Sequence, residues 1–152
     1  MKVYVDADNC NKDSRKIILK ACSRENVPVE LVANRQIPIN TQNVKFTMTV
    51  CEKTKDAADN YIFEKAESDD MAITRDIILA KRLIEKNIFV MNDKGKIFKK
   101  ENIDDLIEQR ELSLQMKSLG ISNGADFPSQ QDTREFSQNF NEILIQKKKI
   151  TS

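Results

Sequence analysis

The sequence predicts a three-layer α/β domain with a mostly parallel sheet and helices on both of its faces. Short apolar runs rich in β-branched residues alternate with longer stretches of helical spacing, and this alternation is typical of βαβ units. The length of 152 residues fits one domain. Crossovers between parallel strands are almost always right-handed, so helices are expected on both faces.

The strands and helices are expected in regular alternation along the first part of the chain. Apolar residues three and four apart mark the helices, and short apolar runs bounded by polar residues mark the strands. The expected strands are residues 3–5, 29–33, 46–50, 71–74 and 88–91, and the expected helices are residues 12–25, 56–66, a stretch from 76, and 101–119.

The C-terminal part predicts a loop, a helix and a short tail. Residues 1–119 are expected to form the α/β domain and residues 120–131 a loop. A helix over residues 132–146 is expected to pack on the same domain, and residues 147–152 are expected to form a basic tail. The expected packing stripe of this helix is Phe136, Phe140, Ile143 and Leu144, and that of the preceding helix is Ile103, Leu106, Ile107 and Leu114.

Composition excludes several classes of protein. The sequence has no histidine, which excludes mechanisms of the Ser-His-Asp and Cys-His types. Its three cysteines lack the CxxC spacing of a zinc site and are expected to be reduced thiols of a cytoplasmic protein. No run is long enough to cross a membrane. The net charge of +1 means that any nucleic acid must be bound by local patches.

Acidic and amide side chains follow the predicted strands at the points where these strands end. Carboxyl ends of parallel strands share one edge of a sheet, and ligands bind there in open α/β folds. Grouped carboxylates repel one another, and a hard cation such as Mg²⁺ or Mn²⁺ removes that repulsion. The acids and the amide that this rule brings to one edge are Asp6, Asp8, Asn34, Asp56, Asp59 and Asp76, and they are expected to hold such a cation.

A purely structural interpretation competes with the metal site for some of these residues. Asp56 and Asp59 have the spacing of a helix N-cap and its partner one turn later, and Asp76 can equally cap the helix that it precedes. Asp6 and Asp8 are harder to explain as caps, because Asn11 or Asp13 would cap the following helix equally well.

Four lysines form a basic stretch that is a candidate for contact with phosphates. They are Lys94, Lys96, Lys99 and Lys100, within and after a predicted turn at residues 93–96. The alternative is that they are only a solvated hairpin and helix start.

The motifs resemble those of the YaiI/YqxD family of uncharacterised bacterial proteins. The resemblance is carried by VDADNC at residues 5–10, VAN at 32–34, DAADNYI at 56–62, AITRDIILA at 72–80 and NDKGKIFKKENI at 92–103. This family is similar to PIN-like nucleases, which are small α/β domains with an acidic metal site. The resemblance implies a PIN-like fold and a metal-binding and catalytic set of Asp6, Asp8, Asp59 and Asp76, with Asn34, Asp56 and Thr74 close by.

Three functions are compatible with these features. The leading one is metal-dependent phosphodiester hydrolysis, with RNA as a more suitable substrate than DNA. The second is a phosphatase of the haloacid-dehalogenase type, with Asp6 of the Asp-x-Asp pair as its nucleophile. The third is a non-catalytic module that binds RNA or protein and retains a vestigial metal site.

Overall fold

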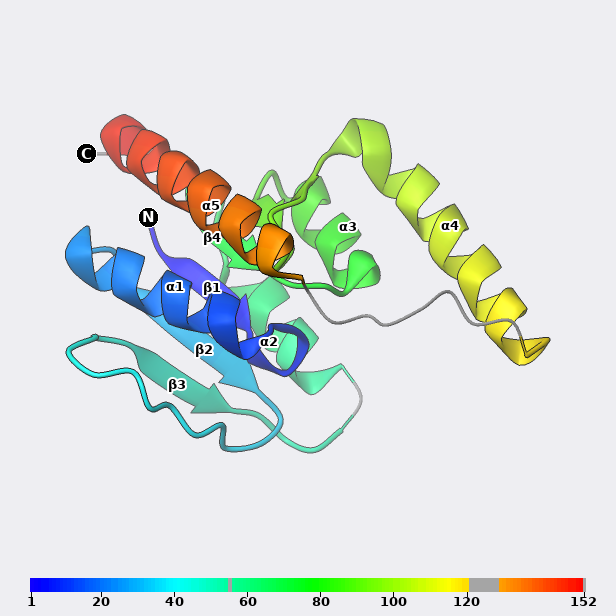
Figure 1. Ribbon diagram of the computed structural model, residues 1–152, viewed down its shortest axis with the longest axis horizontal. Coiled ribbons are helices and arrows are strands. Elements are labelled where there is room, and N and C mark those ends of the chain that lie inside the picture. The colour runs from blue at the N-terminus through cyan, green and yellow to red at the C-terminus, as the bar shows by residue number, and fades with distance from the viewer. Residues whose placement is uncertain (55, 121–128, 152) are drawn as a thin grey trace.

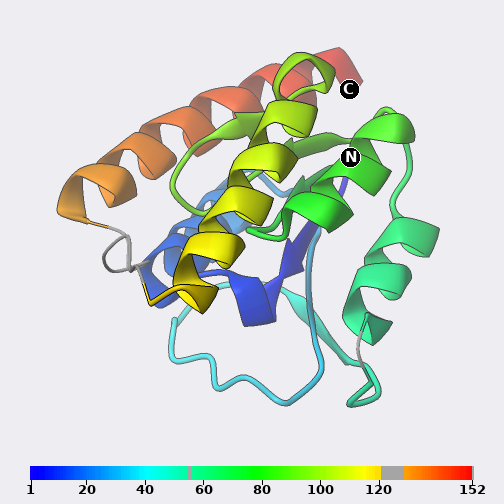
Figure 2. The same cartoon turned by 90° about the vertical axis from the view of Figure 1, so that its right-hand side faces the viewer.

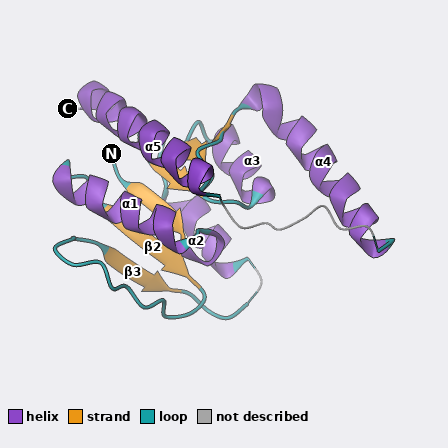
Figure 3. Cartoon of the chain, in the orientation of Figure 1, coloured by secondary structure: helices purple, strands orange, loops and turns teal. Residues whose placement is uncertain are grey.

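The computed structural model describes residues 1–54, 56–120 and 129–151. Its elements in chain order are β1 (Val3–Asp6), a 3-10 turn η1 (Ala7–Asn9), α1 (Lys12–Arg24), β2 (Val29–Ala33), β3 (Thr47–Val50), α2 (Ala57–Lys65), β4 (Met71–Ile73), α3 (Ile77–Glu85), β5 (Phe89–Met91), β6 (Ile97–Phe98), α4 (Lys100–Ser118) and α5 (Gln130–Thr151). Figure 3 colours these helices and strands by type. The loop predicted at residues 120–131 falls largely outside the described residues.

The strands form one sheet in the order β3-β2-β1-β4-β5-β6. All neighbouring pairs are parallel except β5 with β6. The chain first builds outward from β1 to β3, then crosses back to β4 and builds outward on the other side. The point where the order reverses therefore lies between β1 and β4, and ligands bind at the carboxyl ends of the strands beside such a point.

Helices cover both faces of the sheet, which confirms the predicted three-layer α/β class and is consistent with a PIN-like fold. Figures 1 and 2 show α1 and α5 on one side and α2 and α3 on the other. The two sides have separate apolar cores. Val3 and Val5 of β1 pack with Phe136 and Phe140 of α5. Tyr4, which points the other way, packs with the core of α2 and α3.

Gly95 allows α5 to lie close to the turn between β5 and β6. Its φ is +92°, and a Cβ atom there would approach the Phe136 backbone to 3.0 Å. Glycine alone adopts this φ without a steric cost. The Asn139 side chain donates a hydrogen bond of 3.0 Å to the Gly95 carbonyl, which fixes the approach.

The C-terminal helix is longer than predicted. It continues through residues 147–151, where the sequence predicted a tail. Lys147 lies over the Phe89 ring at 5.7 Å, and the Lys148 ammonium is 3.9 Å from Glu25. Cations near the end of a helix also interact favourably with its dipole. These contacts stabilise the C-terminal end of the helix.

The packing stripe predicted for α4 was wrong at one position. Ile103 is buried and Leu106 and Ile107 are partly buried against α3, but Leu114 is 49% exposed. Figure 1 shows the second half of α4 extending away from the sheet, so residues there have no core to face.

A cavity of the acidic strand ends

Five sequence-predicted acids line one cavity at the carboxyl ends of β1, β2 and β4. Its volume is about 200 Å³, and its lining residues are Asp6, Asp8, Asn9, Asn34, Asp56, Ala58, Asp59 and Asp76. Asn34, which the sequence predicted beside the acids, lines the cavity as well. The cavity lies at the reversal of the strand order, where an open α/β sheet binds its ligand.

Asp6 is the most deeply placed of these acids. It ends β1 on the same side as Tyr4, and only 1% of it is exposed. Its Oδ2 atom accepts a hydrogen bond of 2.7 Å from the Thr74 hydroxyl and one of 2.9 Å from the Asn9 amide. Burial raises the pKa of this carboxyl, the two hydrogen bonds oppose the rise, and the charges of Asp76 and Asp8 add to it.

Asp59 comes from the first turn of α2 and lines the same cavity as the other acids. Burial, the charges of Asp6 and Asp76 and a hydrogen bond with Asp76 raise its pKa to about 7. The Asp56 charge adds to the rise. At neutral pH, therefore, a proton on Asp59 partly offsets the repulsion among the carboxylates.

The structure separates the capping and cavity roles that the sequence left open. Asp76 caps α3, because its Oδ1 atom accepts from the Ile78 and Leu79 amides at 3.0 and 3.2 Å. Asp56 precedes α2 but makes no capping hydrogen bond through its side chain, and its φ is +69°. Such a φ is uncommon for a residue other than glycine and is found at functional sites. Asp76 thus caps a helix and also lines the cavity.

Asp8 is held by the loop that follows β2. Its Oδ2 atom accepts a 2.7 Å hydrogen bond from the Asn34 amide nitrogen of the backbone, and its Oδ1 atom lies 3.6 Å from Arg35 Nε. The side-chain oxygen of Asn34 is buried and has no hydrogen-bond partner among the described residues. A buried oxygen without a donor at the cavity wall is a site where a cation or water would be accommodated.

The carboxylates share a cavity, but they do not form a preassembled metal cage. Within the described part of the chain, no three Asp, Glu or Cys side chains lie close enough together to hold a metal ion. The donor chemistry nevertheless fits a hard cation, because the wall offers carboxylate and amide oxygens and no thiol. Occupation by a cation would require Asp59 to lose its proton and the acids to move together.

The four lysines that the sequence grouped lie at two different edges of the sheet. Lys94 and Lys96 belong to the turn after β5, at the same edge as the acids. Because β6 runs back, Lys99 and Lys100 lie at the opposite edge, where Lys100 Nζ is 3.4 Å from the Asn87 side chain that precedes β5. The lysines therefore do not form one patch.

One further acid at this edge of the sheet, Asp93, was not predicted as a site residue. Asp93 follows β5 and is fully buried, and its Oδ2 atom lies 3.1 Å from Arg75 Nε. The same oxygen accepts from the backbone and side-chain nitrogens of Asn11 at 2.8 and 2.9 Å. Asp93 was predicted from the sequence to be a turn residue. It is also an acid at the end of a strand, so the rule that selected Asp6 applies to it equally.

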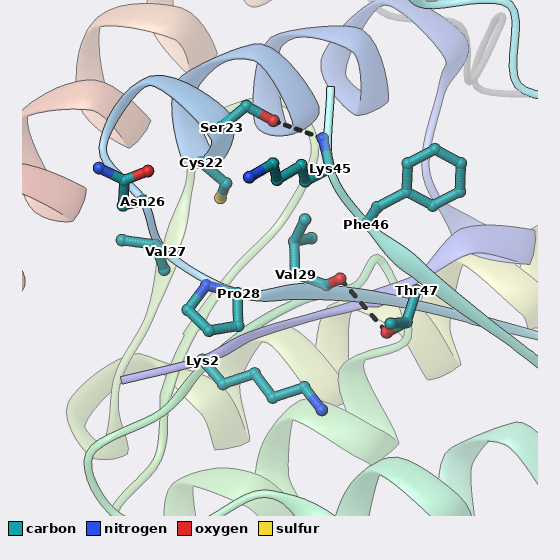
Figure 4. Close-up of a pocket in the computed structure, with 10 residues that line it drawn as sticks. All are labelled: Lys2, Cys22, Ser23, Asn26, Val27, Pro28, Val29, Lys45, Phe46 and Thr47. Atoms are coloured by element: carbon teal, nitrogen blue, oxygen red, sulfur yellow. Dashed lines mark hydrogen bonds between the residues drawn. The ribbon is translucent and has the colours of Figure 1, made fainter. Parts of the chain in front are cut away.

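A larger cavity lies at the other edge of the sheet and shares nothing with the acidic one. It has a volume of about 360 Å³ and surrounds the starts of β2 and β3, where Lys2, Phe46 and Thr47 contribute to its wall (Figure 4). None of the residues that line it is acidic, so it is not part of the candidate site.

Comparison with known proteins places the chain in a family. Residues 4–146 match the model described as "Uncharacterized BCR, YaiI/YqxD family". A UPF0178 protein of Treponema denticola is 42% identical over 122 residues, which cover 80% of this chain and 77% of that protein. One from Aliivibrio fischeri is 35% identical over 97% of this chain and 99% of its own length. The chain belongs to the YaiI/YqxD family, as its motifs indicated.

No solved structure matches this chain. Among the described helices, none combines the length and the apolar composition needed to span a membrane.

The retained proton on Asp59 predicts an unusual pH dependence for the metal-free protein. The folded pKa is about 7 and the ordinary value is 3.8, so the folded state holds a proton that the unfolded chain has released between these values. The stability that this proton contributes is present at low pH and is lost as pH rises toward 7. Melting in EDTA should therefore show a Tm that falls from about pH 5 to about pH 7.5.

Asp59→Asn is the matched variant for this measurement, because the amide keeps the shape and cannot titrate. Its Tm should depend on pH less steeply than that of the wild type over the same range. If the two proteins have the same slope, or if the wild-type Tm rises toward neutral pH, Asp59 does not hold the proton.

Proposed function

We propose that this protein is a divalent-cation-dependent phosphodiester hydrolase that acts on RNA. The observation that carries the proposal is the sharing of one cavity by Asp6, Asp59 and Asp76 at the reversal of the strand order, where burial and the neighbouring charges raise the pKa of Asp59. Folding brings these like charges together at a cost, and perturbed carboxyls in a cleft are candidates for a functional site.

Asp6, Asp8, Asp59 and Asp76 would hold Mg²⁺ or Mn²⁺, with Asn34, Asp56 and Thr74 beside them. When bound, the cation would lower the pKa of a water molecule and neutralise charge on the leaving oxygen. Oxygen-only donors favour these two ions over softer metals. Activation of water by a metal ion requires no histidine base, and the chain contains no histidine.

The residues in and beside the cavity have different roles. Thr74 and Asn9 both donate to Oδ2 of Asp6, which leaves Oδ1 without a hydrogen bond among the described residues. Asp59 is the carboxyl whose pKa is raised to about 7 without a cation, so it would release its proton when the cation binds. Asp76 is fixed by its capping bonds and keeps the end of α3 against the cavity. A cytoplasmic location, which the reduced cysteines favour, would expose the protein to RNA.

The test is cleavage of a panel of end-labelled RNA and DNA oligonucleotides by purified protein with Mn²⁺, Mg²⁺ or EDTA. We expect cleavage of RNA that depends on the cation and is stronger than cleavage of DNA. Absence of cleavage of every substrate in both metals would contradict the proposal. In that case, retained Mn²⁺ binding would favour a non-catalytic module, and a phosphorylated Asp6 trapped from a phosphate monoester would favour the phosphatase mechanism.

A further inference from the structure

Two arginines follow the strands on either side of β1, at the same edge as the acidic cavity. Arg35 comes two residues after β2 and Arg75 two residues after β4, and the sheet order is β2-β1-β4. The segment that leaves β1 between them carries Asp8 and Asn9 of the cavity wall. Since neighbouring strands lie about 4.8 Å apart, the two arginines leave the sheet about 10 Å from each other.

We propose that Arg35 and Arg75 bind backbone phosphates of a single-stranded RNA on the two sides of the phosphodiester that lies at the acidic cavity. The inference rests on the function proposed above and assigns the residues that recognise its substrate. It also replaces the single basic patch expected from Lys94, Lys96, Lys99 and Lys100, because those lysines are divided between two edges of the sheet.

Arg75 is held in one orientation by a buried carboxylate. Its Nε atom is 3.1 Å from Oδ2 of Asp93, which is fully buried, and it donates at 3.4 Å to the carbonyl of Asn9. Asp93 is itself fixed by the two hydrogen bonds from Asn11. A buried anchor of this kind sets the direction of the guanidinium before a ligand arrives.

The outer edge of the Arg75 guanidinium remains available. A guanidinium has five N–H donors in a planar fork, and the contacts of Arg75 use only Nε. The terminal nitrogens form no hydrogen bond with any described residue, and 36% of the side chain is exposed. A planar pair of donors matches two oxygens of a phosphate, which is why arginine is favoured where phosphates are recognised.

Arg35 has a similar arrangement on the other side of β1. Its Nε atom lies 3.6 Å from Oδ1 of Asp8, and 69% of its side chain is exposed. Asp8 is fixed in turn by the backbone nitrogen of Asn34. Each arginine thus has its Nε near an aspartate at this edge, closely for Arg75 and at a longer distance for Arg35, while its fork is open to solvent.

The charge of the cavity explains why a phosphate substrate needs such partners. The cavity wall carries five aspartates and no lysine or arginine, and the net charge of the whole chain is +1. A polyanion approaching these carboxylates is repelled unless cations act beside the cavity. A cavity of about 200 Å³ is small enough to take one phosphodiester segment at a time, so we choose a single strand as the ligand to test.

The experiment measures the salt dependence of RNA binding by fluorescence anisotropy. The probe is a short fluorescein-labelled oligouridine, titrated in EDTA and again in Ca²⁺, which is also an oxygen-binding cation. For a single strand, each phosphate contact contributes about 0.7 to the slope of log K against log salt. Arg35→Gln and Arg75→Gln should each weaken binding about tenfold and flatten the slope by about 0.7, and the double variant by about 1.4.

Two further variants control for loss of fold and for charge alone. Arg24→Gln removes an arginine at the end of α1, remote from the cavity, and should bind like the wild type. Arg75→Lys keeps a cation that can meet Asp93 but lacks the planar fork, so it should keep the slope and lose affinity. Melting curves of all the variants show whether each is folded.

Equal slopes for the wild type and the double variant would overturn the inference, as would absence of binding by the wild type. Tighter binding of a duplex than of the single strand would overturn the choice of a single strand. These results are distinct from failure of the proposed hydrolysis. RNA binding through both arginines without cleavage would preserve the present inference alone, and cleavage with unchanged affinity in the double variant would preserve the hydrolase alone.

Discussion

Asp6→Asn is expected to reduce cation-dependent RNA cleavage at least about 100-fold without unfolding the protein, because a bound cation contributes several kcal/mol of charge stabilisation and each 1.36 kcal/mol is tenfold in rate. An amide has nearly the shape of a carboxyl, and its oxygen can still accept from Thr74 and Asn9 at the position of Oδ2. The substitution therefore removes one charge from the cavity and keeps the local packing. Initial rates with an end-labelled RNA in Mn²⁺ measure the effect.

Glu30→Gln is the matched control for this rate. Glu30 is also a buried carboxylate, 5% exposed, and it lies on the neighbouring strand β2. Its partners are Lys2 and Thr49, and it does not line the acidic cavity. We expect Glu30→Gln to cleave at close to the wild-type rate. Equal rates for Asp6→Asn and the wild type would show that Asp6 takes no part, and that the activity belongs elsewhere or to a contaminant.

Mn²⁺ is expected to raise the Tm of the wild type by about 5–10 °C at a free concentration about 100 times its dissociation constant. A ligand at this ratio adds about 2.7 kcal/mol, and each kcal/mol shifts the Tm of a domain of this size by about 2–4 °C. Asp59→Asn should lose most of this shift. In EDTA at neutral pH it should be as stable as the wild type or more so, because the change relieves repulsion from Asp6 and Asp76.

Asp76→Ala is the variant that behaves differently in the same melts. Its side chain caps α3, so its removal should destabilise the metal-free protein by about 0.5–2 kcal/mol, and it should also reduce the Mn²⁺ shift. A wild-type protein whose Tm does not change with Mn²⁺ would contradict the proposed metal site. The proposed site would also be wrong if Asp59→Asn were destabilised in EDTA as much as Asp76→Ala, since Asp59 would then have a structural role.

Much of the fold follows from local pattern. The strands β1, β2, β4 and β5 are buried and mostly apolar, and a polar residue ends or follows each of them, so their positions could be predicted closely. β6 was missed because it has only two residues and depends on pairing with β5. The outer half of α4 was assigned a packing face from its leucines, but Leu114 has no core opposite it, and periodicity alone does not show that.

The residues of the candidate site could likewise be predicted in part, because their positions follow from where the strands end. The rule that parallel strands end at one edge is enough to bring Asp6, Asp8, Asn34 and Asp76 together. This rule does not identify the acid that caps a helix, the acid that keeps a proton or the acid that lies beside an arginine. Those properties depend on distances across the cavity. Asp93 and Arg75 were overlooked because their pairing links residues 18 apart in sequence, which only the folded chain brings together.

A crystal of the protein soaked in Mn²⁺, with anomalous scattering used to locate the ion, would show whether the acidic cavity binds a divalent cation. We expect manganese in the acidic cavity, bonded to carboxylate oxygens of Asp6, Asp59 and Asp76, with Asp59 no longer hydrogen-bonded to Asp76. A cavity without manganese at a saturating concentration, with Asp59 still sharing its proton with Asp76, would contradict this expectation.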